Sequence, residues 1–150
     1  MTNADLTAQP LKLIGQLHRS FTRIADGQLR ELGFATSQLP VLVALKKNKA
    51  LSQSELARFA RVEQPSMAQL LNRMERDGLV QRVPDPDDKR SRLISLTDSA
   101  SRRMPKGKAI MDAMCEMALE DFSPSDITQL VALLQRMNAN LDRAEDDAGK

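Results

Sequence analysis

The sequence predicts a mainly α-helical fold with one small β-hairpin, and two observations lead to this prediction. Apolar residues recur at helical spacing through most of the chain, and the spacing becomes typical of strands only after Gly78. The chain of 150 residues is long enough for one ordinary globular domain but not for two. We therefore expect a single domain over residues 1–150.

The composition excludes several classes of protein. Hydrophobic residues make up 41% of the chain, enough for a core, but no apolar run approaches the ~20 residues that are needed to cross a bilayer. The polar N-terminal segment lacks the basic region and the apolar stretch of a secretory signal. We expect a cytoplasmic protein that makes no contact with a membrane.

The residues that usually carry catalysis or bind metals are scarce. The chain has one histidine, His18, and one cysteine, Cys115, which together cannot form a closed zinc site. It also lacks a glycine-rich phosphate loop and any Ser/His/Asp grouping. We therefore expect neither an enzyme nor a protein that needs a metal or a cofactor. Because Cys115 lies in a methionine-rich segment, we expect it to be a buried small hydrophobe rather than a redox sensor.

The charge of the chain is unevenly distributed. The net charge of +2 is too small to indicate a nucleic-acid partner by itself. However, residues 1–51 carry seven Lys+Arg and three Asp+Glu, whereas residues 104–150 carry five and nine. A basic front with an acidic tail is compatible with a protein that contacts DNA with one part and assembles through another.

The first helix is expected over residues 10–32, where Gly33 follows as a left-handed C′ residue. Thr36 is expected to cap a second helix that ends near Lys46. Pro40 then falls at the end of its first turn, where the loss of one backbone donor costs little. The apolar stripe of the first helix consists of Leu11, Ile14, Leu17, Phe21, Ile24 and Leu32.

A capping box fixes the start of the third helix. Ser52 and Glu55 have the spacing at which each side chain accepts the other residue's backbone N–H, and leucines on either side complete a hydrophobic staple. This helix is short, because Pro65 follows and suits the first turn of a new helix. A tight turn over residues 61–63 is expected between the two helices.

The fourth helix has one apolar face and one polar face. Met67, Leu70, Leu71 and Met74 have the spacing of a buried stripe, and the helix is expected to end at Gly78. Gln and Asn on the opposite face can pair bidentately with adenine, and Arg with guanine or phosphate. The alternative is an ordinary solvated helix face. The residues we assign to DNA contact on this helix are Gln64, Pro65, Ser66, Ala68, Gln69, Asn72, Arg73 and Arg76.

Two short strand-like runs over residues 79–83 and 92–96 predict a hairpin with a long charged tip over residues 84–91. We expect Asp88 to order this tip and Arg90 to enter a minor groove, because narrow A·T-rich grooves attract arginine. The DNA contacts expected at the tip are Asp88, Lys89, Arg90 and Arg92. A calcium loop is the alternative, but it lacks the glycine and the terminal glutamate of an EF-hand, since Leu96 stands at that last position.

Two helices are expected after the hairpin. Thr97 is expected to cap the first of them. Pro105 is expected either to bend this helix or to shift its start. Ser123 and an acidic residue three positions later mark the start of the second, which carries apolar residues as far as Leu141. From Arg143 onward the chain lacks apolar residues and is expected to fray.

A helix, a tight turn, a second helix and a two-stranded hairpin with a basic tip make up a winged helix-turn-helix, whose second helix enters the major groove of DNA. The predicted fold is therefore a winged helix-turn-helix over residues 36–97, flanked by helices on both sides.

The residues resemble a known family. The segments over residues 51–57, 62–66 and 70–80 are similar to those of the multiple-antibiotic-resistance regulator (MarR) family. Above all, the run from Asp88 to Thr97 matches the Asp-x-Arg-x-x-x-Ile-x-Leu-Thr motif of its wing at every fixed position. Gln-Pro-Ser at the start of the fourth helix resembles the SlyA-like branch. The resemblance covers residues from about 11 to 141.

The resemblance implies a homodimer in which residues 8–33 and 98–143 of the two chains interlock. The two recognition helices then lie about 34 Å apart and read a pseudo-palindromic operator in double-stranded DNA. Ser52 and Gln53 are expected to contact the DNA backbone. The methionines of the C-terminal part, namely Met104, Met111, Met114 and Met117, line either the dimer helices or the core.

Members of the family commonly bind small aromatic carboxylates or phenolic anions in a crevice between the dimer helices and the winged domain, and they then release DNA. The resemblance implies such an effector here, with His18, Arg19 and Arg23 as the residues that meet its charge. A ligand of this kind acts only through its different affinity for two arrangements of the winged domains.

We therefore expect a non-enzymatic DNA-binding transcription regulator, either a repressor or an antagonist of silencing. The alternative is a winged-helix module that binds proteins and has no specific affinity for DNA. The substitution Arg90→Ala distinguishes the two, because only a DNA-binding protein would lose affinity for DNA.

Overall fold

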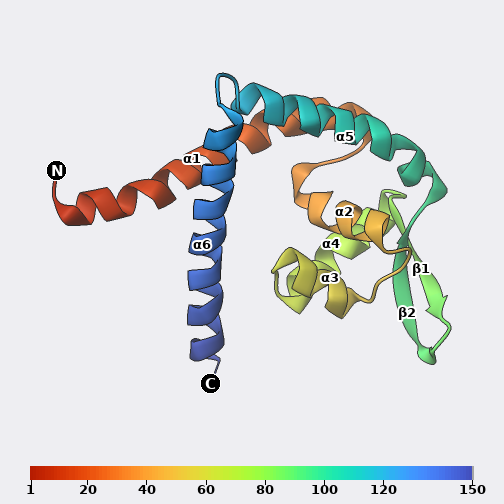
Figure 1. Ribbon diagram of the computed structural model, residues 1–150. Coiled ribbons are helices and arrows are strands. Elements are labelled where there is room, and N and C mark those ends of the chain that lie inside the picture. The colour runs from red at the N-terminus through yellow and green to blue at the C-terminus, as the bar shows by residue number, and fades with distance from the viewer. Residues whose placement is uncertain (150) are drawn as a thin grey trace. The chain divides into compact units, whose positions relative to one another are not determined.

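The computed structural model describes residues 1–149, which divide into two compact units, residues 1–112 and the remainder from residue 113; the boundary lies within helix α5 (Figure 1). The mainly helical fold with one antiparallel hairpin is confirmed. The elements in chain order are α1 (Asn3–Leu29), η1 (Arg30–Leu32), η2 (Thr36–Gln38), α2 (Leu39–Lys47), α3 (Gln53–Ala60), α4 (Gln64–Arg76), β1 (Val80–Asp85), β2 (Asp88–Leu96), α5 (Asp98–Ala118) and α6 (Pro124–Ala148).

Helix α1 begins at Asn3, so the expected start at Pro10 was wrong. The reason is a capping box: the Asp5 N–H donates to Thr2 Oγ1 over 3.1 Å, and the Thr2 N–H donates to Asp5 Oδ2 over 2.9 Å. The Thr2 backbone N–H and hydroxyl hold the pKa of the Asp5 carboxyl below its ordinary value. This reciprocal cap is therefore lost only as the pH falls through that lowered pKa.

The segment between α1 and α2 differs from its expected form. Thr36 does not cap a helix, because it lies inside the 3₁₀ turn η2, where its N–H donates to Asp26 Oδ1 over 2.7 Å. Helix α2 starts only at Leu39, and Pro40 stands in its first turn. The expected left-handed conformation of Gly33 is confirmed by its φ of 76°.

The helix-turn-helix forms as expected. Glu55 N–H donates to Ser52 Oγ over 3.1 Å, and Ser52 N–H donates to Glu55 Oε1 over 3.2 Å, so the capping box of α3 is complete. Arg61 takes the left-handed conformation with a φ of 57° and turns the chain into α4. A Schellman motif ends α4, since Leu79 N–H donates to the Met74 carbonyl over 2.9 Å and Gly78 N–H to the Glu75 carbonyl over 3.1 Å.

The hairpin is longer than expected and its turn is shorter. Asp85 pairs with Asp88, so the turn consists of residues 86–87 and the predicted long tip was wrong. The register shifts between Pro84, which pairs with Arg92, and Asp85, so residues 89–91 bulge out of the ladder. Two aspartates turn the chain locally: Asp85 Oδ1 accepts the Asp87 N–H and Asp88 Oδ1 accepts the Arg90 N–H, each over 2.9 Å.

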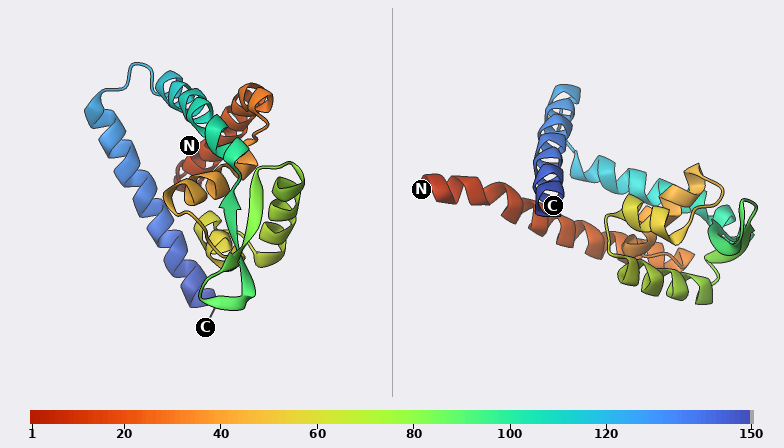
Figure 2. Two further views of the ribbon diagram at one scale, coloured as in Figure 1. Left: turned by 90° about the vertical axis from the view of Figure 1, so that its right-hand side faces the viewer. Right: turned by 90° about the horizontal axis from the view of Figure 1, so that it is seen from below.

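The core of the first unit lies between the helix-turn-helix and the hairpin. Helix α3 packs on α2 and α4, while β1 lies beside α4 and β2 beside α2 (Figure 2). Leu51 pairs with β2 as an isolated antiparallel bridge, because it exchanges two backbone hydrogen bonds with Ile94. The side chains of this core that are completely or almost completely buried include Val41, Leu42, Leu45, Leu56, Met67, Leu71, Met74, Leu79, Val80 and Ile94.

Both C-terminal helices start where the sequence predicts. Thr97 Oγ1 accepts the Ala100 N–H over 3.1 Å and donates to the Gly78 carbonyl over 2.7 Å, which ties the start of α5 to the end of α4. Pro105 therefore lies inside α5 without shifting its start. Ser123 caps α6 reciprocally with Asp126. Helix α6 extends to Ala148, so the expected fraying from residue 143 was wrong.

Arg103 of α5 contacts the segment that follows α1, at Leu32 and Phe34. Its Nη1 donates to the Leu32 carbonyl over 2.5 Å, and its guanidinium lies 5.4 Å from the centre of the Phe34 ring. A Cβ added to Gly107, one turn further along α5, would lie only 3.3 Å from the Phe34 ring, so α5 packs closely there.

Alanine substitutions at Gly33, which lies beside Arg103, and at Gly78, which ends α4, test the contacts of Arg103 by comparison. Gly78→Ala should lower the free energy of unfolding by about 1–2 kcal/mol, because the left-handed φ of 73° is retained and the space beside it is open. Gly33→Ala should cost more, because its Cβ would also lie 2.7 Å from Arg103 Nη1, and the arginine can move away only by giving up its hydrogen bond to the Leu32 carbonyl. Urea denaturation measures both. If the difference persists in an Arg103→Ala background, the clash is not its cause.

Candidate nucleic-acid interface

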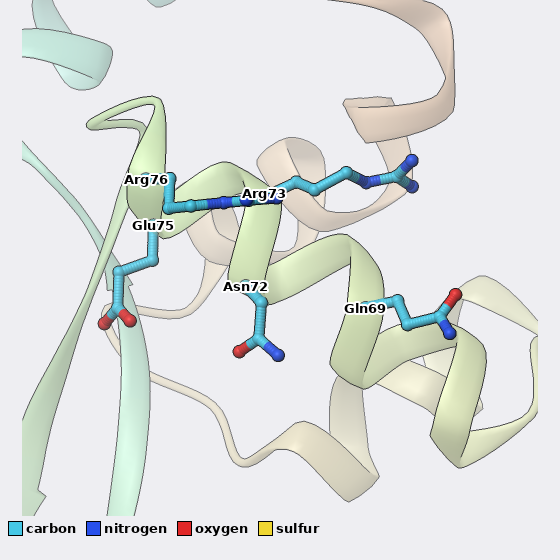
Figure 3. Close-up of a pocket in the computed structure, with 5 residues that line it drawn as sticks. All are labelled: Gln69, Asn72, Arg73, Glu75 and Arg76. Atoms are coloured by element: carbon cyan, nitrogen blue, oxygen red, sulfur yellow. The ribbon is translucent and has the colours of Figure 1, made fainter.

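The polar face of α4 is exposed as the sequence predicts. Gln64, Pro65, Ser66, Gln69, Asn72, Arg73 and Arg76 are exposed, and Ala68 is half-buried. Five side chains line an open recess of about 540 Å³ on this face: Gln69, Asn72, Arg73, Glu75 and Arg76. Figure 3 shows that Gln69 and Arg73 point away from the strands, whereas Glu75 points toward them. The α4 face thus combines hydrogen-bonding amides with two arginines.

The hairpin contributes an arginine to this face that sequence reasoning missed. Arg82 of β1 donates from Nη2 to Asn72 Oδ1 over 3.0 Å, and its Nε lies 3.5 Å from Glu75 Oε2. The hairpin and α4 are therefore linked through side chains. The sequence carries no signal of these contacts, because the register of a strand against a helix is set by tertiary packing.

The start of α3 lies close to the start of α4. Gln53 and Gln64 are joined by a hydrogen bond of 3.2 Å between their side-chain amides. The Ser52 hydroxyl already accepts the Glu55 N–H. The structure thus brings Gln53 together with the N-terminal turn of α4.

The tip of the hairpin presents positive charge. Lys89, Arg90 and Arg92 are exposed, and Lys89 and Arg90 lie in the bulge. The hydrogen bond between Asp88 Oδ1 and the Arg90 N–H agrees with the ordering role that we expected for Asp88. This bulge frees the backbone of Lys89 and Arg90 from the ladder and projects both side chains from one short segment.

An apolar cavity of about 490 Å³ lies between α2 and α5 within the first unit. Phe34, Leu39, Leu42, Val43, Met104, Gly107 and Met111 line it together with Lys46, Lys47 and Lys108. All three lysines are exposed, and Lys108 forms an ion pair with Asp112. The cavity therefore has an apolar interior with ammonium groups around it, which sequence reasoning did not find.

The residues expected to bind an effector lie elsewhere. His18, Arg19 and Arg23 are exposed on α1 and are not part of the wall of the α2–α5 cavity. Cys115 is exposed in this chain, so the expectation that it is buried was wrong. Met117, two positions further along α5, is exposed as well, with 59% of its surface accessible.

Within residues 1–149, no helix is both long and apolar enough to cross a membrane. In the same part of the chain, the histidine, cysteine, aspartate and glutamate side chains form no group of three that could hold a metal ion.

Comparison with known proteins decides the family. The model of the MarR family matches residues 32–91. The transcriptional activatory protein BadR of Rhodopseudomonas palustris is 34% identical over 140 residues, which are 88% of this chain and 75% of that protein. The chain belongs to the MarR family.

A further relative and two solved structures agree with this assignment. The transcriptional repressor NicR of Pseudomonas putida is 28% identical over 99% of this chain and 91% of its own length. The solved structure of the transcriptional regulator SlyA superimposes with a TM-score of 0.82 at 25% identity, over 89% of this chain and 94% of that one. A mutant MarR from E. coli complexed with operator DNA shares the fold, with a TM-score of 0.80 at 20% identity over 91% and 99%.

Within this MarR-family chain, the match over residues 32–91 spans the helix-turn-helix and most of the hairpin. It includes the α4 face, Arg82 and Arg90.

Proposed function

We propose that this MarR-family protein is a sequence-specific DNA-binding transcriptional regulator that acts as a homodimer on a pseudo-palindromic operator. The observation that carries the proposal is the exposed polar α4 face beside a hairpin with an exposed basic tip, both within one compact unit. Amides and arginines on a helix surface suit the major groove, and an arginine on a projecting tip suits the minor groove.

The residues divide into three groups by the part of DNA that they contact. The α4 side chains read base edges: Gln64, Pro65, Ser66, Ala68, Gln69, Asn72, Arg73 and Arg76. The tip residues Asp88, Lys89, Arg90 and Arg92 hold or enter the adjacent minor groove. Ser52 and Gln53 at the start of α3 contact the phosphate backbone, which fixes the register of α4 without reading the sequence.

Exposed apolar side chains favour the homodimer. On α1, Leu11 and Leu17 expose 59% and 62% of their surface, and on α6 Leu133 and Leu141 expose 46% and 59%. Apolar surface of this extent marks an interface. We assign residues 36–97 to DNA binding and residues 8–33 and 98–143 to dimerisation, all within one MarR-type domain.

The effect on transcription depends on where the operator lies relative to a promoter. The relatives include a protein named as activatory and one named as a repressor. We place this chain with the regulators that either repress or antagonise silencing. A reporter assay that moves the operator from within to upstream of a promoter tests this assignment.

Fluorescence anisotropy tests the proposed function. The purified protein is titrated onto the DNA upstream of its own gene, with unlabelled random DNA as competitor, at several salt concentrations. We expect binding that survives the competitor and weakens linearly with the logarithm of the salt concentration, because phosphate contacts release counterions. Loss of all binding in competitor, followed by failure to select any site from random DNA, would favour the protein-interaction module instead.

The α2–α5 cavity supports an effector site. Its apolar interior suits an aromatic ring, and Lys46 and Lys47 suit a carboxylate or phenolate. We propose that a small aromatic carboxylate or phenolic anion binds there, and not beside His18, Arg19 and Arg23. Such a ligand releases DNA by favouring a spacing of the winged units that does not fit the operator.

Filling the cavity tests the effector site. Val43 lines the cavity and is 42% exposed, so Val43→Trp should occupy part of the space at little cost in stability. Benzoate, as the simplest aromatic carboxylate, should then lose at least about tenfold in affinity by isothermal titration calorimetry, which is about 1.4 kcal/mol. Lys12→Met, on the exposed surface of α1, is the control and should bind benzoate normally. Equal benzoate affinity in Val43→Trp and the wild type would place the site elsewhere.

A further inference from the structure

The link between Arg82, Asn72 and Glu75 has a consequence for base recognition. Arg82 stands in β1, and its guanidinium bridges two residues of α4 that lie three positions apart. The side chain of Arg82 is 32% exposed and that of Glu75 is 44% exposed. The contact is therefore at the edge of the α4 face and not in the core.

The chemistry of arginine determines the orientation of the Asn72 amide. A guanidinium has five N–H donors and no acceptor, so only the oxygen of the amide can face it. Figure 3 shows the oxygen of Asn72 turned toward the strands and its nitrogen turned toward Gln69. A reversed amide would place its NH₂ group against the guanidinium and lose this hydrogen bond.

Glu75 keeps the guanidinium in place. Its carboxylate attracts Arg82 from the next turn of α4, so the guanidinium is held between two acceptors. Arg82 in turn compensates a negative charge that would otherwise stand beside a phosphate backbone. The pair therefore explains why a glutamate is tolerated among the residues that line the recess.

A fixed amide reads a base pair in one direction. In the major groove, adenine offers its N6 amino group to an amide oxygen and its N7 to an amide nitrogen. Because the oxygen of Asn72 has a second lone pair, it can accept from adenine while it also accepts from Arg82. The order of oxygen and nitrogen along the groove then decides whether A·T or T·A fits.

We propose that Arg82 is a positioning residue that fixes the amide of Asn72 and thereby sets the base preference at one position of each half-site. This inference rests on the proposed function. Without Arg82 both orientations of the amide become available, so the preference at that position falls while contacts elsewhere are retained.

Selection from random DNA tests the inference. The full-length wild type, Asn72→Ala and Arg82→Met are each used to enrich binding sites, and the base preference is compared position by position. Asn72→Ala identifies the position that Asn72 reads, where a good bidentate contact discriminates about 5- to 150-fold. Arg82→Met should lose most of this discrimination at the same position and keep the preferences at all others.

Two further variants separate positioning from a structural role. Arg82→Lys retains a donor and a positive charge, so it should restore part of the lost discrimination. Glu75→Ala changes an exposed helix residue and should weaken the preference at the same position, which keeps the test valid if Arg82→Met does not fold. In an Asn72→Ala background, Arg82→Met should cause no further loss of discrimination.

Two results would overturn the inference. One is an unchanged preference at the Asn72 position in both Arg82→Met and Glu75→Ala. The other is a loss of preference at every position, which would mean that Arg82 supports α4 as a whole. A wild type that selects no sequence would overturn the proposed function and this inference with it, and that outcome is recognisable before any variant is made.

Discussion

Arg90→Ala should weaken operator binding by about 1–3 kcal/mol per wing, which is about 5- to 150-fold for each wing of the dimer. The bulge over residues 89–91 projects Arg90 from the tip, and the Asp88 carboxylate fixes its backbone. An arginine in a narrow minor groove meets concentrated negative potential, so its removal loses more than one phosphate contact would.

Fluorescence anisotropy with the selected operator and with random DNA measures this effect. Arg30→Ala removes the same charge from an exposed position after α1 and serves as the matched control. Loss of affinity should be larger for an operator with an A·T-rich flank than for one with a G·C-rich flank. If Arg90→Ala and Arg30→Ala bind DNA equally well, the tip does not enter the groove.

Leu134→Glu should convert the dimer to a monomer at micromolar concentration. Leu134 lies on the apolar stripe of α6 with 38% of its surface exposed in the single chain. Transfer of an unpaired glutamate from water into an apolar interface is unfavourable. Removal of the leucine also loses the free energy gained by burying its side chain. Because one winged unit alone contacts only half of a pseudo-palindrome, operator affinity should fall by several orders of magnitude.

Sedimentation equilibrium measures the dimer, and anisotropy measures the accompanying loss of operator affinity. Gln135→Glu adds the same charge on another face of α6 and should leave the dimer intact. A wild type that sediments as a monomer would contradict the dimer itself, whereas a dimeric Leu134→Glu would place the interface on another surface.

Local signals in the sequence predicted much of the fold. The capping box at Ser52 and the glycine end of α4 are made by residues within six positions of one another, so their spacing alone determines the hydrogen bonds. The polar and apolar faces of α4 follow from helical periodicity in the same way. These features place the α4 face without any knowledge of long-range contacts.

The errors have two physical sources. At the start of α1 and in the hairpin turn, Asp5 and Asp85 accept backbone N–H groups of nearby residues, and these local bonds start the helix earlier and tighten the turn more than apolar periodicity indicates. At Arg82 and in the α2–α5 cavity, the partners lie far apart in the chain. Such contacts depend on strand register and helix packing, which residue spacing does not encode.

The position of Phe34 links the α2–α5 cavity to the contacts of Arg103. The Phe34 ring lines the α2–α5 cavity. The same ring contacts the guanidinium of Arg103, which donates a hydrogen bond to the Leu32 carbonyl. We expect a molecule large enough to tilt that ring to weaken the contact between Phe34 and Arg103, and a smaller one to leave this contact intact. We therefore expect the size of a bound molecule to affect the segment between α1 and α2, which belongs neither to the α4 face nor to the tip of the hairpin.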